Sequence, residues 1–254
     1  MKKTITMMAM GLTCLTAVAQ NHTQNVSSDY LNQLSTQFVY NKKIRQINEL
    51  EIHVQKIKPS IIPSTDVFAK PPVASEPKSF YRKYIFKPNI YPNITHSQHH
   101  THLPESSWHG EIISLLGNWE IWIERGSLNL PNIQTSHIEI EPLPKEWSKG
   151  TQEFTVDVEY NTANSGSFYK VKEQCTIYPS VLAQFLHPKI KGKARKLICQ
   201  QIQVQKNSLP ITSELSIYTA YFLEDYQFVI PFSKTIYDYD GTVSVENVHI
   251  KVFR

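Results

Sequence analysis

The stretch Phe168-Tyr-Lys-Val-Lys-Glu-Gln-Cys-Thr-Ile177 largely alternates between apolar and polar residues. Tyr169, Val171, Cys175 and Ile177 share one parity, and successive side chains of a β-strand point to opposite faces of the sheet. The stretch therefore predicts a strand whose apolar face carries Cys175 toward the core.

A second strand-like run contains the other cysteine of the predicted mature chain: Lys196-Leu-Ile-Cys-Gln-Gln-Ile-Gln-Val204. Its parity changes after Cys199. A β-bulge at Gln200 and Gln201 would place four apolar residues on one face: Leu197, Cys199, Ile202 and Val204. In an oxidising compartment two cysteines without a C-x-x-C motif favour a disulfide. We predict a bond between Cys175 and Cys199.

Period-two alternation continues through the second half of the chain, from Trp108 onward. Further strands are expected at residues 119–124, 137–141, 154–160, 215–223, 228–237 and 242–253. In the last of these the apolar parity changes, which predicts a bulge near Glu246 and Asn247. The predicted fold is mainly β, an antiparallel sandwich or a small soluble barrel. An outer-membrane barrel is the competing architecture, but eight glycines and a final Arg254 are atypical of it.

A short helical segment is expected to precede this β domain, within residues 20–58. Apolar residues recur at helical spacing from Ser28, with Ser27 or Ser28 as the N-cap. The apolar residues before residue 40 and the apolar residues after residue 43 would lie on nearly opposite faces of one helix. We therefore expect a break at residues 40–43. Leu50, Ile52 and Val54 also alternate as a strand would, and helix is the favoured interpretation.

Residues 59–107 predict a proline-rich linker. Eight of the fifteen prolines lie between Pro59 and Pro104, and no glycine does. The expected organisation is a signal peptide (1–19), a helical segment (20–58), this linker and a β domain with one disulfide (108–254).

The N-terminal residues are typical of a bacterial secretory signal peptide. Met-Lys-Lys precedes an apolar run, and Ala17-Val18-Ala19 offers a small-residue cleavage site. Removal of 1–19 takes away Lys2 and Lys3, which lowers the formal charge from +4 to +2. After cleavage no run is long enough for a membrane helix. We expect a periplasmic or secreted protein.

Histidines are concentrated at the end of the predicted linker and just beyond it: five of ten lie within fourteen residues. Neutral imidazoles bind zinc or copper, so the tract is a candidate metal site. A solvated polar linker is the alternative interpretation. The candidate ligands are His96, His99, His100, His102 and His109.

Five cations follow one another closely between the cysteine strands. Such a segment can contact phosphate or carboxylate polymers of a cell envelope, although a solvated face is the ordinary use. The candidate polyanion-binding residues are Lys189, Lys191, Lys193, Arg195 and Lys196.

The strands also carry pairs of carboxylates. Glu120 and Glu124 share one predicted face beside Trp122, a candidate sugar platform, and Glu139 and Glu141 share another. No hydrolase, zincin, P-loop or dinucleotide motif is present.

These features favour an exported, non-catalytic binding or structural module whose partner is an envelope protein or polymer and not a nucleic acid. The first alternative is a zinc- or copper-binding protein that uses the histidine tract. The second is an envelope enzyme that acts on glycans.

Overall fold

The computed structural model describes twelve stretches of the chain, and the statements below concern these residues: 26–38, 40, 44–57, 78–88, 91–102, 107–124, 132–147, 149–162, 168–206, 209–210, 215–237 and 243–254. The predicted signal peptide lies outside them.

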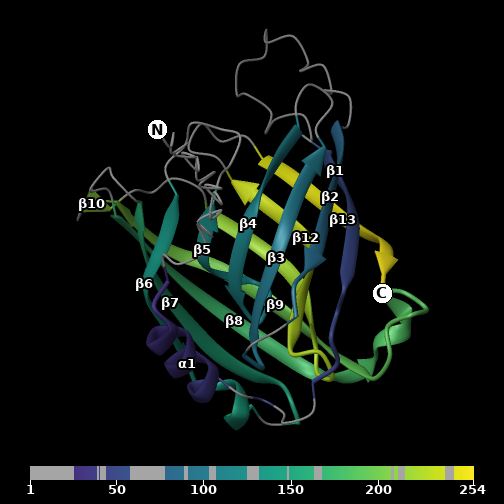
Figure 1. Ribbon diagram of the computed structural model, residues 1–254, viewed down its shortest axis with the longest axis horizontal. Helices are drawn as coiled ribbons and strands as arrows, with labels where there is room; N and C mark the ends of the chain where they lie inside the picture. Colours follow the sequence, from purple (N-terminus) through teal and green to yellow (C-terminus); the bar gives the residue numbers. More distant parts are fainter. Residues whose placement is uncertain are drawn as a thin grey trace, which may run out of the picture.

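The described residues form one α-helix, two short 3-10 helices and thirteen strands (Figure 1). The helices are α1 (Ser28–Gln37), η1 (Pro144–Glu146) and η2 (Ala183–Phe185). The strands are β1 (Glu49–Ile57), β2 (Lys78–Phe86), β3 (Ile94–His102), β4 (Ser107–Leu115), β5 (Trp119–Glu124), β6 (Ile133–Glu141), β7 (Gln152–Thr162), β8 (Phe168–Leu182), β9 (Lys193–Lys206), β10 (Leu209–Pro210), β11 (Leu215–Leu223), β12 (Phe228–Tyr237) and β13 (Val243–Phe253).

Twelve of the strands close into an antiparallel barrel (Figure 1). The order around it is β9-β11-β12-β13-β1-β2-β3-β4-β5-β6-β7-β8, and pairing of β8 with β9 closes the circle. β10 pairs with β9 beside this circle. Closure leaves each barrel strand with a hydrogen-bonded neighbour on both sides, which removes exposed edges.

The mainly β prediction is confirmed, and the barrel is the architecture found. The sandwich alternative is wrong because β8 and β9 join the two ends of one continuous sheet. From Trp119 onward, the predicted strands correspond to β5 to β9 and β11 to β13. In β9 the register shifts between Gln201 and Gln203, next to the predicted bulge.

The predicted bulge at Glu246 and Asn247 is not present, since both residues pair in unbroken register with β12 and β1. Glu246 points into the barrel beside Val248. The change of apolar parity therefore reflects a polar inward position and not an inserted residue.

The N-terminal segment is only partly helical. α1 is confirmed, and the Ser27 hydroxyl accepts a hydrogen bond from the Tyr30 backbone N–H at 3.3 Å, as an N-cap does. The expectation of helix in the second half is wrong, because β1 pairs with β13 and β2. Leu50, Ile52 and Val54 are all buried by this pairing.

The expectation that residues 59–107 form a linker outside the β domain is also wrong for the part that is described. β2 and β3 are adjacent strands of the barrel wall. β2 also pairs with β1, and β3 also pairs with β4. The first residue of β4, Ser107, is in the same range. The remainder of the predicted linker, 59–77, 89–90 and 103–106, lies outside the described residues.

One end of the barrel is covered by α1, which lies low in Figure 1. Leu34 and Phe38 are buried in the cluster that contains Leu116 of the β4–β5 turn. The Asn93 amide donates to the Leu34 carbonyl at 3.4 Å, and the Tyr40 N–H donates to Gln227 Oε1 at 3.0 Å. These contacts join the N-terminal segment to three turns at that end.

The described residues contain no helix with the length and apolar character needed to cross a membrane.

Candidate functional site

A cavity of about 290 Å³ lies inside the barrel. Residues from β2, β5, β8, β11 and β12 line it, and these strands come from opposite sides of the circle. Side chains nearly fill an eight-stranded barrel, whereas more strands leave a wider interior. The volume is close to the lower limit of small-molecule sites, roughly 300 Å³.

Glu173 of β8 is held in this cavity by directed hydrogen bonds. The Tyr218 hydroxyl donates to Glu173 Oε2 at 2.8 Å, and the Trp119 indole N–H donates to the same oxygen at 3.2 Å. The Asn118 amide donates in turn to the Tyr218 hydroxyl oxygen at 3.2 Å. Burial raises the pKa of Glu173, and the two donors only partly oppose this shift.

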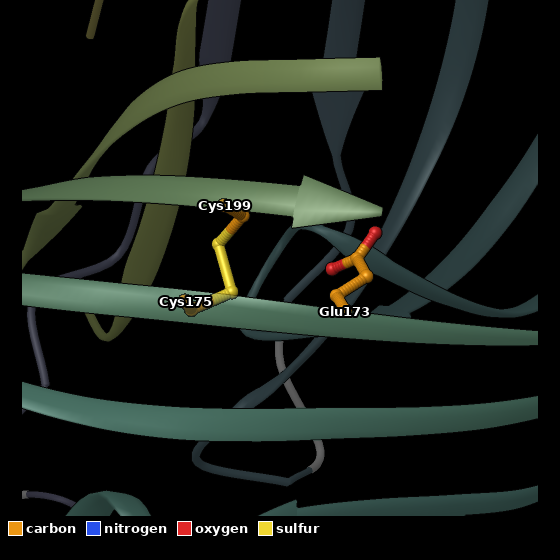
Figure 2. Close-up of side chains that lie close together, drawn as sticks. All are labelled: Glu173, Cys175 and Cys199. Carbon is orange, nitrogen blue, oxygen red and sulfur yellow. A yellow bond between two sulfur atoms is a disulfide. The ribbon is translucent and has the colours of Figure 1, made fainter. Parts of the chain in front are cut away.

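The disulfide stands beside Glu173 in the barrel wall (Figure 2). Cys175 and Cys199 face each other across β8 and β9, with an S–S distance of 2.05 Å and a Cα–Cα distance of 4.0 Å, so the predicted bond is confirmed. Glu173 and the two sulfur atoms lie within 4.8 Å of one another. Because the sulfurs are bonded to each other, they offer no thiolate to a metal.

Glu120 of β5 faces the same cavity. Burial raises the pKa of Glu120, and the nearby charge of Glu173 raises it further. Lys234 and Arg82 also line the cavity, and their charges act in the opposite direction without cancelling the increase. Two carboxyl groups that are costly to ionise therefore share one cavity with two cations.

The cavity combines hydrogen-bonding groups with aromatic surfaces. Ser97, Ser114 and Ser216 contribute hydroxyl groups, and the rings of Tyr84 and Trp119 contribute flat surfaces. Carboxylates accept hydrogen bonds from hydroxyl or amine groups, and the cations donate them. This set can bind and orient a small molecule that carries several polar groups.

The structure separates the predicted histidine ligands by strand parity. His99 points inward and is buried, whereas His96 and His100 are only partly buried and His102 and His109 are exposed. His96 Nε2 lies 2.9 Å from Glu111 Oε2, and Lys87 Nζ lies 2.7 Å from Glu111 Oε1. The five histidines therefore do not converge on one point.

His99 is packed among aromatic rings. Its ring stacks on Tyr84 at a centroid distance of 4.6 Å and meets Trp108 edge-on at 4.5 Å. Its Nε2 lies 2.9 Å from the Thr101 hydroxyl oxygen, and its Nδ1 has no hydrogen-bond partner. Burial lowers the pKa of His99 to about 3, which keeps the ring neutral.

The five predicted polyanion-binding residues divide as well. Lys189, Lys191 and Lys193 are exposed, and the Lys196 ammonium lies 5.9 Å from the centre of the Tyr178 ring. Arg195 is buried, and its guanidinium donates to the carbonyls of Tyr178 at 2.8 Å and Gly150 at 2.7 Å. Arg195 is therefore a structural residue, and the prediction is wrong for it.

The predicted face shared by Glu120 and Glu124 is also wrong. The register of β4 with β5 shifts at Ser114, so Glu120 turns into the barrel whereas Glu124 lines a hollow on the outside. Trp122 is buried and offers no sugar platform. Glu139 and Glu141 share the exposed outer face of β6, as predicted.

The sequence contained a signal for the cavity residues that the prediction missed. Glu173 has the same parity as Val171 and Cys175, and Glu246 has the same parity as Val248. A charged residue at an inward position of a strand marks either a buried pair or a polar interior. Arg82 carries a comparable signal, because it has the same parity as the aromatic residues Phe80 and Tyr84.

A comparison of this chain with protein-family models, with curated proteins and with solved structures finds no match.

Proposed function

We propose that this protein is an exported binding protein that holds a small polar molecule inside its barrel. The observation that carries the proposal is the barrel cavity that Glu120 and Glu173 both line. Burial of carboxyl groups disfavours their ionised form, and groups with such shifted pKa values gather at functional sites. A purely structural interior of this size would favour apolar side chains.

The chemistry of the lining favours a molecule with several hydroxyl or amine groups, such as a sugar or amino sugar. Glu173 is oriented by Tyr218 and Trp119, which leaves its second oxygen free of these two donors. Lys234 and Arg82 can donate to ligand oxygens, and the Trp119 ring can pack on the apolar face of a sugar ring. An envelope polymer or protein is a less suitable ligand for a cavity of about 290 Å³ inside a barrel.

Export is supported by the Cys175–Cys199 bond, because disulfides persist in oxidising compartments. It is supported independently by the signal-like N-terminal sequence. A periplasmic or secreted location remains part of the proposal.

A second candidate is hydrolysis of a glycoside in the same cavity. Glycosidases use two carboxyl groups, one of which is kept protonated by a raised pKa. The raised pKa values of Glu120 and Glu173 are compatible with this arrangement. Binding is the primary proposal because the pKa values of Glu120 and Glu173 are both raised, whereas a glycosidase needs one of its two carboxyl groups ionised.

The test is a thermal-shift and calorimetric screen of monosaccharides, amino sugars and amino acids against the mature chain. A ligand of the cavity should lose at least about tenfold in affinity with Glu173→Gln or Tyr218→Phe, since a buried polar group loses its partner. Gln174→Ala is the matched control, because Gln174 is exposed on the outer face of the same strand. Binding that both cavity variants leave unchanged would reject the proposal, and product formation would favour hydrolysis.

A further inference from the structure

An apolar patch lies on the outside of the barrel, where β8 ends and the chain turns into β9. Its members are large side chains that stay exposed to solvent: Val181, Leu182, Phe185 and Phe232. Leu182 is 68% exposed and Phe185 is 55% exposed, the two highest values among the exposed large hydrophobic residues of the described stretches. Exposed apolar side chains that gather in one place mark contacts with a partner or a membrane.

Ring contacts extend the patch across two more strands. Phe185 of η2 meets Tyr221 of β11 edge-on at a centroid distance of 5.0 Å, and Tyr221 meets Phe232 of β12 in the same way at 5.3 Å. In Figure 1 the turn between β8 and β9, which contains η2, stands out at the lower right beside the C-terminus. The patch therefore extends from a projecting turn onto the adjoining barrel wall.

Three lysines lie beside this patch. Lys189 and Lys191 belong to the same turn, and both are exposed. Lys193 is also exposed, and it is directly opposite Leu182 in the pairing of β8 with β9. Opposed residues of an antiparallel pair lie on one face of the sheet. Positive charge is therefore placed next to the most exposed apolar side chain.

The two acids of the neighbouring β11–β12 turn are engaged elsewhere. This turn lies against the start of β9, since the Glu224 N–H donates to the Lys193 carbonyl at 3.0 Å. The Glu224 carboxylate accepts a hydrogen bond from the Ser180 hydroxyl, and Asp225 Oδ2 lies 3.3 Å from Arg45 Nε. Both carboxylates therefore have partners other than the three lysine ammonium groups.

The combination of apolar side chains and lysines suits an anionic lipid surface. At such a surface apolar side chains enter the boundary between head groups and acyl chains, and lysines contact the lipid phosphates. The long apolar stem of lysine allows its ammonium group to stay at the level of the head groups. The core of a protein interface is instead depleted in lysine, and a polyanionic polymer offers nothing to bury Leu182 and Phe185.

We propose that this surface docks the protein reversibly on a membrane that contains anionic phospholipids. Leu182 and Phe185 enter the interface, and Lys189, Lys191 and Lys193 contact the phosphates. The contact is peripheral, because it involves one turn and the adjoining outer wall. It does not depend on what the barrel cavity binds.

The experiment is cosedimentation of a chain of residues 20–254 with vesicles of equal parts phosphatidylglycerol and phosphatidylcholine, and with vesicles of phosphatidylcholine alone. We expect binding to the anionic vesicles that weakens as salt is added, because salt screens the lysines from the phosphates. Leu182→Ser/Phe185→Ser should weaken binding by at least about tenfold, since two large apolar side chains no longer leave water. Lys189→Gln/Lys191→Gln/Lys193→Gln should weaken it by at least about tenfold as well, since each lysine contributes roughly a factor of five.

Ile85→Ser and Lys78→Gln are the matched controls, because both residues are exposed on β2, on the opposite side of the circle from β8. Both variants should bind the vesicles as the unmodified chain does. Circular dichroism should show that every variant keeps the β fold, which separates loss of the contact from loss of structure. Failure of the unmodified chain to bind anionic vesicles would overturn the proposal. Undiminished binding by Leu182→Ser/Phe185→Ser would also overturn it, in favour of a polyanion that contacts the lysines alone.

Discussion

Glu173 and Glu159 are the same chemical group on two neighbouring strands, in opposite environments. Glu159 lies on the outer face of β7, where Lys170 Nζ is 2.6 Å from its Oε1 and lowers the pKa of Glu159. Glu173 lies on the inner face of β8, where burial raises its pKa. The Lys170 ammonium therefore favours the ionised form of Glu159, whereas burial disfavours the ionised form of Glu173.

This difference separates structural acids from candidate functional acids. Glu49 resembles Glu159, since hydrogen bonds from Lys83 and Arg254 lower its pKa. Glu120 resembles Glu173, because burial raises its pKa. Acids that oppose folding are retained most often where function needs them. The contrast depends on closure of the barrel, because only a closed barrel has an interior in which Glu120 and Glu173 are half-buried and partly shielded from water.

The largest expected effect follows from breaking that closure. A chain of residues 107–254 lacks α1 and β1 to β3, and it leaves β4 and β13 as unpaired edges. It also loses the buried residues Ile52, Val54 and Phe80. We expect no cooperative thermal unfolding by circular dichroism, in contrast to a chain of residues 20–254.

This result would also decide between the barrel and a separate β domain behind a linker. A fragment of residues 107–254 that unfolds cooperatively at the melting temperature of the longer chain would contradict the closed barrel.

Removal of the disulfide measures how much this bond stabilises the barrel wall beside Glu173. Its cysteines are separated by 24 residues, and closing such a loop stabilises the folded state by roughly 3 kcal/mol in the chain-entropy model. The Cys175→Ala/Cys199→Ala variant should melt roughly 6–12 °C lower than the unmodified protein, given about 2–4 °C per kcal/mol for a chain of this size. Reductant should lower the melting temperature of the unmodified protein only. Reactive thiols in the native protein would show that the bond is absent.

The sequence predicted those strands in which inward apolar residues alternate with outward polar residues. β7 is an example, because Phe154, Val156 and Val158 are buried whereas Asp157 and Glu159 are paired with lysines. The cysteine pairing could also be predicted, since the two cysteines lie on the apolar faces of neighbouring strands.

The strands that line the polar interior could not be recognised in this way. In β3 the buried inward residues are Thr95, Ser97, His99 and Thr101, so the strand has no apolar alternation. In β5 a register shift moves Glu120 inward, and such a shift depends on pairing with β4. Side chains at a cavity follow the chemistry of the cavity, and only the closed barrel shows that a cavity exists.

The smallest expected effect compares the two acids directly. Glu173→Gln keeps an oxygen that accepts from Tyr218 and Trp119 but removes the buried charge. Because the folded-state pKa of Glu173 is raised, the folded state binds more protons than the unfolded state, and stability falls as the pH rises from about 4.3 through that pKa. The variant should therefore lose part of this pH dependence and melt about 2–4 °C higher at neutral pH, as expected for a gain of about 1 kcal/mol.

Glu159→Gln is the matched outer variant, and its effect should have the opposite sign. The pKa of Glu159 is lowered, so its contribution to stability is present above the unfolded-state pKa and is lost as the pH falls through the folded-state pKa. The variant should melt slightly lower at neutral pH, and the difference should disappear in acid, because exposed ion pairs contribute little. Thermal melts of both variants from pH 2 to 8 make the comparison. A lower melting temperature for Glu173→Gln at neutral pH would mean that Lys234 and Arg82 fully compensate the buried charge. The role of Glu173 would then be structural, like that of the ion-paired acids on the outer face.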